Sequence, residues 1–143
     1  GRYAVSLHPG GWWKGSGVAL ENAWRPEVAA VAQLSGVTMV DVDYPLVPEA
    51  SLPEVMSAVA AATAWARRQA GWVGAWGYSS GGALAVLCAQ LFDALALTFP
   101  HLDLTVLPDD VRAGVDEFPT TPTGKVVRRE LVALVTEPSA QPA

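Results

Sequence analysis

The chain has 143 residues, of which 51% are hydrophobic and 16% are charged, and its net charge is −5. This composition predicts a packed core and argues against an intrinsically disordered chain. The negative charge argues against nucleic acid or an anionic membrane as a partner, and no apolar run reaches the roughly 18 residues that a membrane span needs.

Strands and helices are expected to alternate along the first hundred residues. Pro26 suits the first turn of a helix that Gly36 ends, and a longer helix after Pro53 shows apolar residues at the helical period of three to four. Alternation of this kind implies a parallel sheet with right-handed crossovers. We predict an α/β fold with about four strands, at 3–7, 37–42, 73–76 and 94–99, and helices at 26–34, 53–70 and 81–91.

The first strand leads into Leu7-His8-Pro9-Gly10-Gly11-Trp12-Trp13. Consecutive glycines let the main chain approach other groups closely and adopt conformations closed to other residues. Such a bend can supply main-chain N–H groups to a developing oxyanion. The alternative is a plain glycine turn in which His8 is structural and the two tryptophans pack in the core.

The second strand is followed by Asp43-Tyr44-Pro45-Leu46-Val47-Pro48-Glu49-Ala50-Ser51-Leu52-Pro53. Its three prolines exclude a helix and hold the segment extended. From the residues alone this segment is predicted to be a rigid, ordered loop.

The third strand runs into Gly77-Tyr78-Ser79-Ser80-Gly81-Gly82, which has the pattern G-x-S-x-G. An apolar run precedes it and a run rich in alanine and leucine follows it. A serine at such a tight strand-to-helix turn has its hydroxyl exposed at the end of the sheet, which is the geometry of a nucleophile elbow. The alternative is a glycine-rich turn without chemistry.

These three segments, in this order, resemble the hormone-sensitive-lipase-like esterase branch of the α/β-hydrolases over about residues 3–105. The resemblance implies a lipase-like serine hydrolase in which Ser79 is the nucleophile. The oxyanion hole would be formed by the main-chain N–H groups of Gly10, Gly11 and Ser80. Pro9 departs from the family, which usually has a glycine there. The substrate would be a small acyl compound. Its binding site would be lined by residues at or beside these motifs: His8, Trp12, Trp13 and Tyr78.

The base and the carboxylate that would take the proton of Ser79 are harder to identify in the sequence than the nucleophile. A serine nucleophile needs a base, and the base needs an orienting carboxylate. His101 is the only histidine after Ser79, and the only acid between them, Asp93, precedes the last strand and is expected at the wrong edge of the sheet. Asp103 follows that strand on the correct edge. An improvised relay of His101 and Asp103 is therefore one possibility, and a loop position for His101 is the other.

A different resemblance begins near residue 107. The stretch Asp116-Glu117-Phe118-Pro119-Thr120-Thr121-Pro122-Thr123-Gly124-Lys125-Val126-Val127-Arg128-Arg129 resembles the C-terminal end of acyl-adenylate-forming ligases, the acyl-CoA synthetase and adenylation family. That resemblance, over about 107–135, would make Lys125 a lysine that contacts the carboxylate and phosphate. We therefore divide the chain into a truncated α/β-hydrolase core (1–105), a ligase-like segment (106–136) and a disordered tail (137–143).

Two functions follow as expectations. The first is a serine hydrolase of carboxylic esters that needs no metal or cofactor. The second is a non-catalytic fusion remnant or accessory module of a biosynthetic pathway, and adenylation by this chain is a distant third. The single Cys88 excludes an intrachain disulfide and fits a reducing, cytoplasmic location. A sheet cut on both sides predicts association through exposed strand edges.

Overall fold

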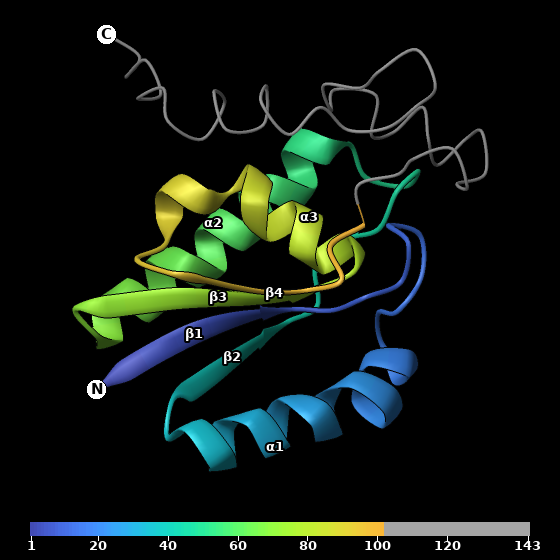
Figure 1. Cartoon of the computed structure of the whole chain (residues 1–143). Coiled ribbons are helices and arrows are strands. Elements are labelled where there is room, and N and C mark those ends of the chain that lie inside the picture. The colour runs from blue at the N-terminus through green and yellow to red at the C-terminus, as the bar shows by residue number, and fades with distance from the viewer. Residues whose placement is uncertain (102–143) are drawn as a thin grey trace, which may run out of the picture.

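The computed structural model of the chain describes residues 1–101. They form a single sheet with helices on both faces (Figure 1). The elements in chain order are β1 (Arg2–Leu7), the π-helical turn η1 (Leu20–Trp24), α1 (Arg25–Ser35), β2 (Thr38–Val42), α2 (Leu52–Gln69), β3 (Trp72–Tyr78), α3 (Ser80–Leu87), the 3₁₀ turn η2 (Ala89–Leu91) and β4 (Leu95–Thr98). Asp103, Lys125 and the segments 106–136 and 137–143 lie outside the described residues.

All four strands are parallel, in the order β2-β1-β3-β4. Val5 at the centre of β1 pairs with Val40 of β2 on one side and with Ala75 of β3 on the other. In β4, Ala96 pairs with Trp76. The predicted α/β class, with a parallel sheet of four strands flanked by helices, is thus confirmed.

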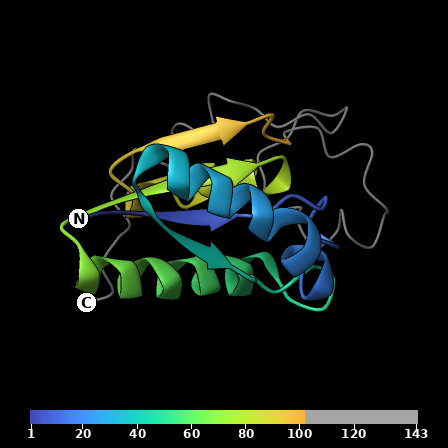
Figure 2. The same ribbon diagram turned by 90° about the horizontal axis from the view of Figure 1, so that it is seen from below.

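The helices are divided between the two faces of the sheet. α2 and α3 cover one face and α1 lies on the other (Figures 1 and 2). The main core lies on the α2 and α3 side, where Val5, Val59 and Val73 are fully buried. A smaller cluster on the α1 side consists of Leu20, Trp24 and Val28. The sheet is therefore covered much more completely by α2 and α3 than by α1.

Local signals explain the limits of the two long helices. α2 begins with a capping box, in which the Ser51 hydroxyl accepts from the Glu54 N–H and the Glu54 carboxylate accepts from the Ser51 N–H. Such reciprocal bonds satisfy two donors that a helix start otherwise leaves free. α1 ends at Gly36, which has φ 68°, a left-handed conformation that favours glycine. The helix expected from Pro26 starts at Arg25 and is preceded by η1, which the sequence did not predict.

An ion pair fixes the amino end of β3. The Arg67 guanidinium lies 2.6 Å from the Asp93 carboxylate, which also accepts the N–H of Val73 at 2.7 Å. Both bonds lower the pKa of Asp93, and the bond from Arg67 has the larger effect. Asp93 is thereby held at the edge of the sheet opposite Ser79, as the sequence predicted.

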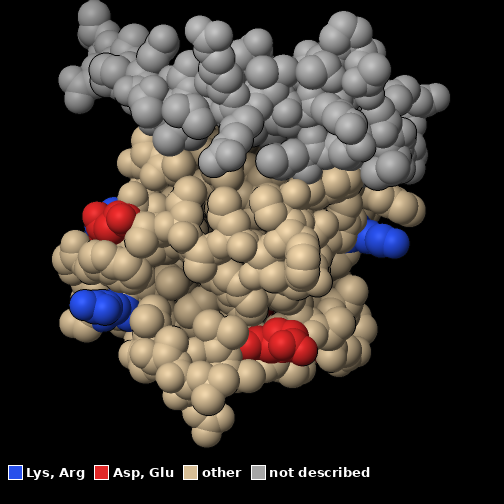
Figure 3. All heavy atoms as spheres, viewed as in Figure 1, with Lys and Arg blue, Asp and Glu red and all other residues tan. Residues whose placement is uncertain are grey.

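Charged side chains are few and far apart on the face shown in Figure 3. None of the helices within residues 1–101 is both long and apolar enough to cross a membrane.

Candidate active site

Ser79 is the single residue between β3, which ends at Tyr78, and α3, which begins at Ser80. Its main chain has φ 55° and ψ −119°. A positive φ is uncommon for a residue with a side chain, and it persists only where the surrounding structure enforces it. The side chain is half-buried. Ser79 is thus a strained residue at a sharp turn between a strand and a helix.

The glycines on either side of Ser79 leave no room for a side chain. A methyl group at Gly77 would overlap the carbonyl of Gly81, and one at Gly81 would overlap the carbonyl of Leu7. The turn folds the start of α3 back against the end of β3, so both positions must be glycine. Small residues are therefore required two positions before and two positions after the serine.

The glycine bend after β1 is also built from left-handed residues. Gly10 has φ 142°, Gly11 has φ 63° and Trp12 has φ 79°. The N–H groups of Trp13 and Lys14 both donate to the carbonyl of Gly10, at 3.3 and 3.1 Å. These bonds close the bend on itself.

The bend and the serine turn meet through main-chain contacts. A methyl group at Gly81 would lie 2.7 Å from the carbonyl oxygen of His8, so the start of α3 touches the start of the bend. The same His8 oxygen accepts a 2.6 Å hydrogen bond from the hydroxyl of Tyr44, in the proline-rich loop. Burial raises the pKa of Tyr44, which keeps this hydroxyl protonated as a donor. All three sequence motifs therefore converge at the carboxyl end of the sheet.

His8 itself is inaccessible to solvent. Its ring stacks on Tyr44 with the centroids 4.0 Å apart and the planes 2° from parallel. Its Nδ1–H donates to the carbonyl of Pro9 at 2.7 Å. Burial lowers the pKa of His8, against the smaller opposing effects of the Pro9 bond and of the nearby aspartates. This placement favours the structural alternative for the His8 side chain.

The two tryptophans of the bend lie in different environments. Trp12 is 1% exposed and belongs to the main core, which favours the packing alternative for its side chain. Trp13 is 44% exposed, and the Lys14 ammonium lies 5.1 Å from the centre of its ring. Trp13 thus remains available at the surface beside the bend.

Tyr78, next to Ser79, is half-buried between two aromatic rings. Its ring meets Trp24 edge-on at 5.9 Å and Phe99 edge-on at 6.1 Å. Phe99 is 80% exposed. Tyr78 therefore connects the serine turn to an open aromatic surface beyond β4.

A hollow of about 350 Å³ opens beside the glycine bend. It is lined mainly by small and apolar residues: Pro9, Gly10, Lys14, Gly15, Ala19, Ala23 and Trp24. The part of this wall that the sequence analysis missed is Trp24. Its indole N–H donates to the Ser6 hydroxyl at 2.9 Å, and that hydroxyl donates to Asp41 at 3.3 Å. No sequence motif signals this link, because its three residues come from three separate elements.

Two carboxylates belong to β2 and its end: Asp41 lies in the strand and Asp43 follows it directly. Burial raises the pKa of Asp41, although the Ser6 hydroxyl and Arg25, 3.6 Å away, lower it in part. The carboxylate of Asp43 accepts the N–H of Gly17 at 3.2 Å. The Asp43 carboxylate thus anchors the loop that follows the bend, whereas the Asp41 carboxylate contacts Ser6 of β1 and Arg25 of α1.

The segment after β4 reaches back to the serine. The N–H of Ser79 donates to the carbonyl of Thr98 at 2.9 Å, and the N–H of His101 donates to the carbonyl of Ser79 at 2.8 Å. A methyl group at Gly82 would lie 3.1 Å from Pro100. His101 is therefore brought beside Ser79 through its main chain, whereas its candidate partner Asp103 lies outside the described residues.

Comparison with known proteins identifies the family. The model of the alpha/beta hydrolase fold family matches residues 4–136. A comparison with curated proteins gave no match.

Several solved structures are similar. An esterase of Pyrobaculum calidifontis has 24% identity and a TM-score of 0.64, over 78% of this chain and 45% of that chain. A hormone-sensitive lipase from a metagenome library has 24% identity and a TM-score of 0.63, over 75% and 39%. Carboxyl esterase 2 of Tuber melanosporum has 22% identity and a TM-score of 0.62, over 93% and 45%.

The chain spans less than half the length of each of these structures. At such identities the likeness concerns the fold, and the family match extends over most of the sequence. The chain therefore belongs to the alpha/beta hydrolase fold family.

Proposed function

We propose that the chain is a serine hydrolase of carboxylic esters, in which Ser79 is the nucleophile. The observation that carries the proposal is the conformation of Ser79, whose φ of 55° is enforced at a turn too crowded for any residue but glycine at 77 and 81. Strain of this kind is a cost to folding, and it is concentrated at functional sites.

The chemistry follows from the groups around the turn. The Ser79 oxygen attacks the ester carbonyl, and negative charge develops on the carbonyl oxygen. Main-chain N–H groups already fixed in place stabilise that charge without reorganisation. The Ser80 N–H at the start of α3 and those of Gly10 and Gly11 in the bend are the proposed donors. Loss of the alcohol leaves an acyl-serine, which water then hydrolyses.

The contact between Gly81 and the His8 carbonyl supports this grouping of donors. It places the start of the bend against the first turn of α3, and the Tyr44 hydroxyl holds the same carbonyl. The hollow of about 350 Å³ beside Gly10 offers space for one side of the ester. Trp13 and Tyr78 do not line this hollow; they are proposed as further contacts with the substrate, because their exposed or half-buried rings lie beside the motifs.

The proton of Ser79 requires a base. Within residues 1–101, no side chain forms a hydrogen bond with the Ser79 hydroxyl. A relay of His101 and Asp103 is the alternative to a loop position for His101, and we favour the loop position, because the bond that joins His101 to Ser79 comes from its main chain. Removal of a base from such a site leaves some acceleration from the oxyanion hole and from binding, so slow turnover alone would be ambiguous.

The experiment is labelling with a fluorophosphonate, with the adduct mapped by mass spectrometry. We expect an adduct on Ser79 that is absent from Ser79→Ala. Ser57→Ala, a serine on the exposed side of α2, is the matched control and keeps the adduct. Failure of the unmodified chain to react would overturn the proposal.

The second candidate function is a non-catalytic remnant or accessory module. A folded chain that binds an ester but never acquires the fluorophosphonate adduct would support it. The ligase-like reading of Lys125 has its own test, since ATP–pyrophosphate exchange that is lost in Lys125→Ala would establish adenylation. A cytoplasmic location remains our prediction from the single Cys88.

A further inference from the structure

The proline-rich loop between β2 and α2 contacts the glycine bend at two points. The Tyr44 hydroxyl donates to the carbonyl of His8 at 2.6 Å, and the main-chain N–H of Val47 donates to the carbonyl of Trp12 at 3.0 Å. Residues 9–11 lie between these two carbonyls. The part of the bend that carries the proposed oxyanion donors is therefore enclosed between two anchors from one loop.

The loop that supplies these anchors is fixed in the core. Tyr44 and Val47 are each 1% exposed and belong to the main core. Pro45, between them, has a fixed φ, and the N–H of Ala50 donates to the carbonyl of Leu46 at 2.9 Å. The loop is therefore a stiff support for the bend.

The Tyr44 hydroxyl holds the bend at the place where the bend meets the serine turn. The Tyr44 ring stacks on the ring of His8, with the centroids 4.0 Å apart, and its hydroxyl bonds the main chain of the same residue. A methyl group at Gly81 would lie 2.7 Å from that His8 oxygen. One carbonyl thus joins the loop, the bend and the first turn of α3.

The bend depends on such outside support. Gly10 and Gly11 have φ values of 142° and 63°, and glycine has more conformational freedom to lose than any other residue. The N–H groups of Trp13 and Lys14 donate to the carbonyl of Gly10, within the bend itself. These internal bonds close the bend but do not fix its position relative to α3.

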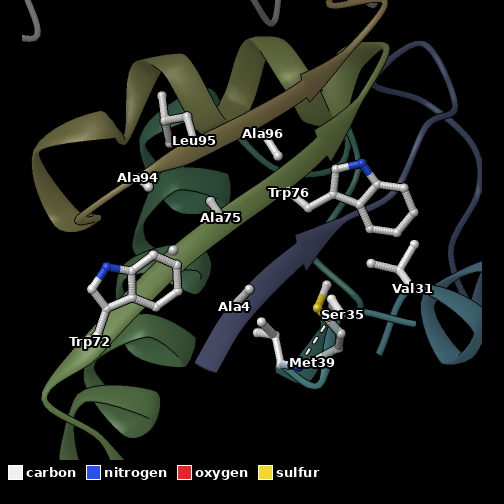
Figure 4. A pocket seen from close by; sticks show the side chains of 12 residues that line it. Ala4, Val31, Ser35, Met39, Trp72, Ala75, Trp76, Ala94, Leu95 and Ala96 are labelled. Carbon is white, nitrogen blue, oxygen red and sulfur yellow. Dashed lines mark hydrogen bonds between the residues drawn. The ribbon is translucent and has the colours of Figure 1, made fainter. Parts of the chain in front are cut away.

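The open hollow of about 370 Å³ on the α1 side of the sheet lies apart from these contacts (Figure 4). Its lining includes Trp72, Trp76, Ala4 and Gly74, but no residue of the bend or of the proline-rich loop. The strands at this hollow therefore provide an internal reference for measurements on the bend.

We propose that Tyr44 is a positioning residue for the oxyanion hole, whose hydroxyl holds the N–H groups of Gly10 and Gly11 toward the ester carbonyl at Ser79. The proposal rests on the proposed function of Ser79 as a nucleophile. Tyr44 acts through the His8 carbonyl and is not itself a catalytic residue. Donors stabilise a developing charge only where they are already in place, and a misplacement of about 1 Å can slow a reaction about hundredfold.

The first test is hydrogen exchange in Tyr44→Phe, which keeps the stacked ring and removes only the hydroxyl. Exchange at the amides of Trp13 and Lys14, which close the bend, should become about fivefold faster, the expected effect of one lost hydrogen bond. Exchange at Ala4 and Gly74, beside the α1-side hollow, should stay at the rate of the parent. Circular dichroism confirms that the variant stays folded.

The second test compares the kinetics of fluorophosphonate labelling at Ser79. In Tyr44→Phe the maximal labelling rate should fall about tenfold or more, while the half-saturating concentration of the probe should stay unchanged, because the contacts that bind the probe remain. Tyr3→Phe is the matched control, since Tyr3 is half-buried and its ring contacts Trp65. It should alter neither the labelling nor the exchange of the bend.

Unchanged exchange in the bend of Tyr44→Phe overturns the proposal, and so does a maximal labelling rate equal to that of the parent. The proposal also fails if exchange at Ala4 and Gly74 rises as much as exchange in the bend, because the hydroxyl then stabilises the fold as a whole. A parent chain that is never labelled overturns the proposed function instead, and the exchange rates then show whether Tyr44 holds the bend.

Discussion

The main-chain N–H of His101 donates a 2.8 Å hydrogen bond to the carbonyl oxygen of Ser79. That oxygen also accepts from the N–H groups of Gly82 and Ala83, so the strained residue is held from α3 and from the segment after β4 at the same time. The proximity of His101 to the serine is therefore created by its main chain and is independent of its side chain.

Two substitutions of His101 separate the contribution of its main-chain N–H from that of its side chain. His101→Ala keeps the N–H, so we expect the rate of fluorophosphonate labelling at Ser79 to stay within twofold. His101→Pro removes the N–H and should lower the free energy of unfolding by about 1 kcal/mol, the typical worth of one hydrogen bond, and slow the labelling. A hundredfold loss in His101→Ala would instead assign the imidazole as the base.

The crowding at Gly77 predicts a large difference in stability between substitutions at Gly77, inside β3, and at Gly71, just before it. A methyl group at Gly77 meets the main chain of α3, whereas one at Gly71 meets nothing within 4 Å. Gly77→Ala should lower the free energy of unfolding by about 2 kcal/mol or more, as overpacking does, and Gly71→Ala should leave it nearly unchanged. Urea denaturation measures both. Equal stability of the two variants would contradict the geometry of the serine turn.

The burial of His8 predicts a pH dependence of stability. Because burial lowers its pKa in the folded state below the ordinary value of 6.5, the unfolded chain binds more protons below pH 6.5. Stability should be unaffected above that pH and should fall as the pH drops below it, by at most about 1.4 kcal/mol per pH unit.

The control for that measurement is His8→Phe, which keeps an aromatic ring against Tyr44 but does not titrate. From pH 7 to pH 5, the unfolding free energy of the parent should fall relative to that of His8→Phe. Asp41, whose raised pKa acts in the opposite sense, is present in both proteins, and only its small electrostatic interaction with His8 differs between them. A difference that is constant with pH would show that His8 keeps an ordinary pKa.

The capping box of α2 gives a prediction for stability alone. Ser51→Ala removes the hydroxyl that accepts the Glu54 N–H, and loss of such a cap costs about 1 kcal/mol. Ser57→Ala, an exposed serine within the same helix, should cost little. Thermal unfolding followed by circular dichroism compares the two, and similar melting temperatures would argue against a functional cap.

The outer edge of β4 predicts association between chains. In the sheet formed by residues 1–101, β4 is an edge strand; Leu97 in it is 41% exposed and Phe99 beyond it is 80% exposed. Charged residues on an edge prevent pairing with another strand, so Leu97→Lys should shift the sedimentation profile toward the monomer. Leu34→Lys, at an 89% exposed leucine on α1, is the control and should not. A parent chain that sediments as a monomer at all concentrations would contradict this prediction.

The sequence predicted the sheet and the serine turn because their signals are local. Alternating apolar runs with Pro26, Gly36 and the prolines of the loop set element limits within a few residues of those observed. The turn at Ser79 was readable because glycine is required two positions away on each side. A pattern of this kind depends on neighbours in sequence, which sequence reasoning handles well.

Other parts of the site depend on contacts between distant segments, which no local pattern records. The π-helical turn η1 places Trp24 against Ser6 of β1, and the hollow beside the bend depends on that contact. Trp12 and Trp13 are adjacent in sequence, yet one is in the core and the other at the surface. Trp12 also has a positive φ in the bend, which residue type does not encode.

The order of the strands has a consequence for biosynthesis. β1 is translated before the other described strands, but it occupies an interior position in the sheet. Val5 therefore gains its second pairing partner only after Ala75 has been synthesised. Pairings so remote along the polypeptide make folding slow and leave intermediates prone to aggregation. When only the first half of the chain has been synthesised, one edge of β1 is therefore still unpaired. We expect a chaperone to bind that nascent strand.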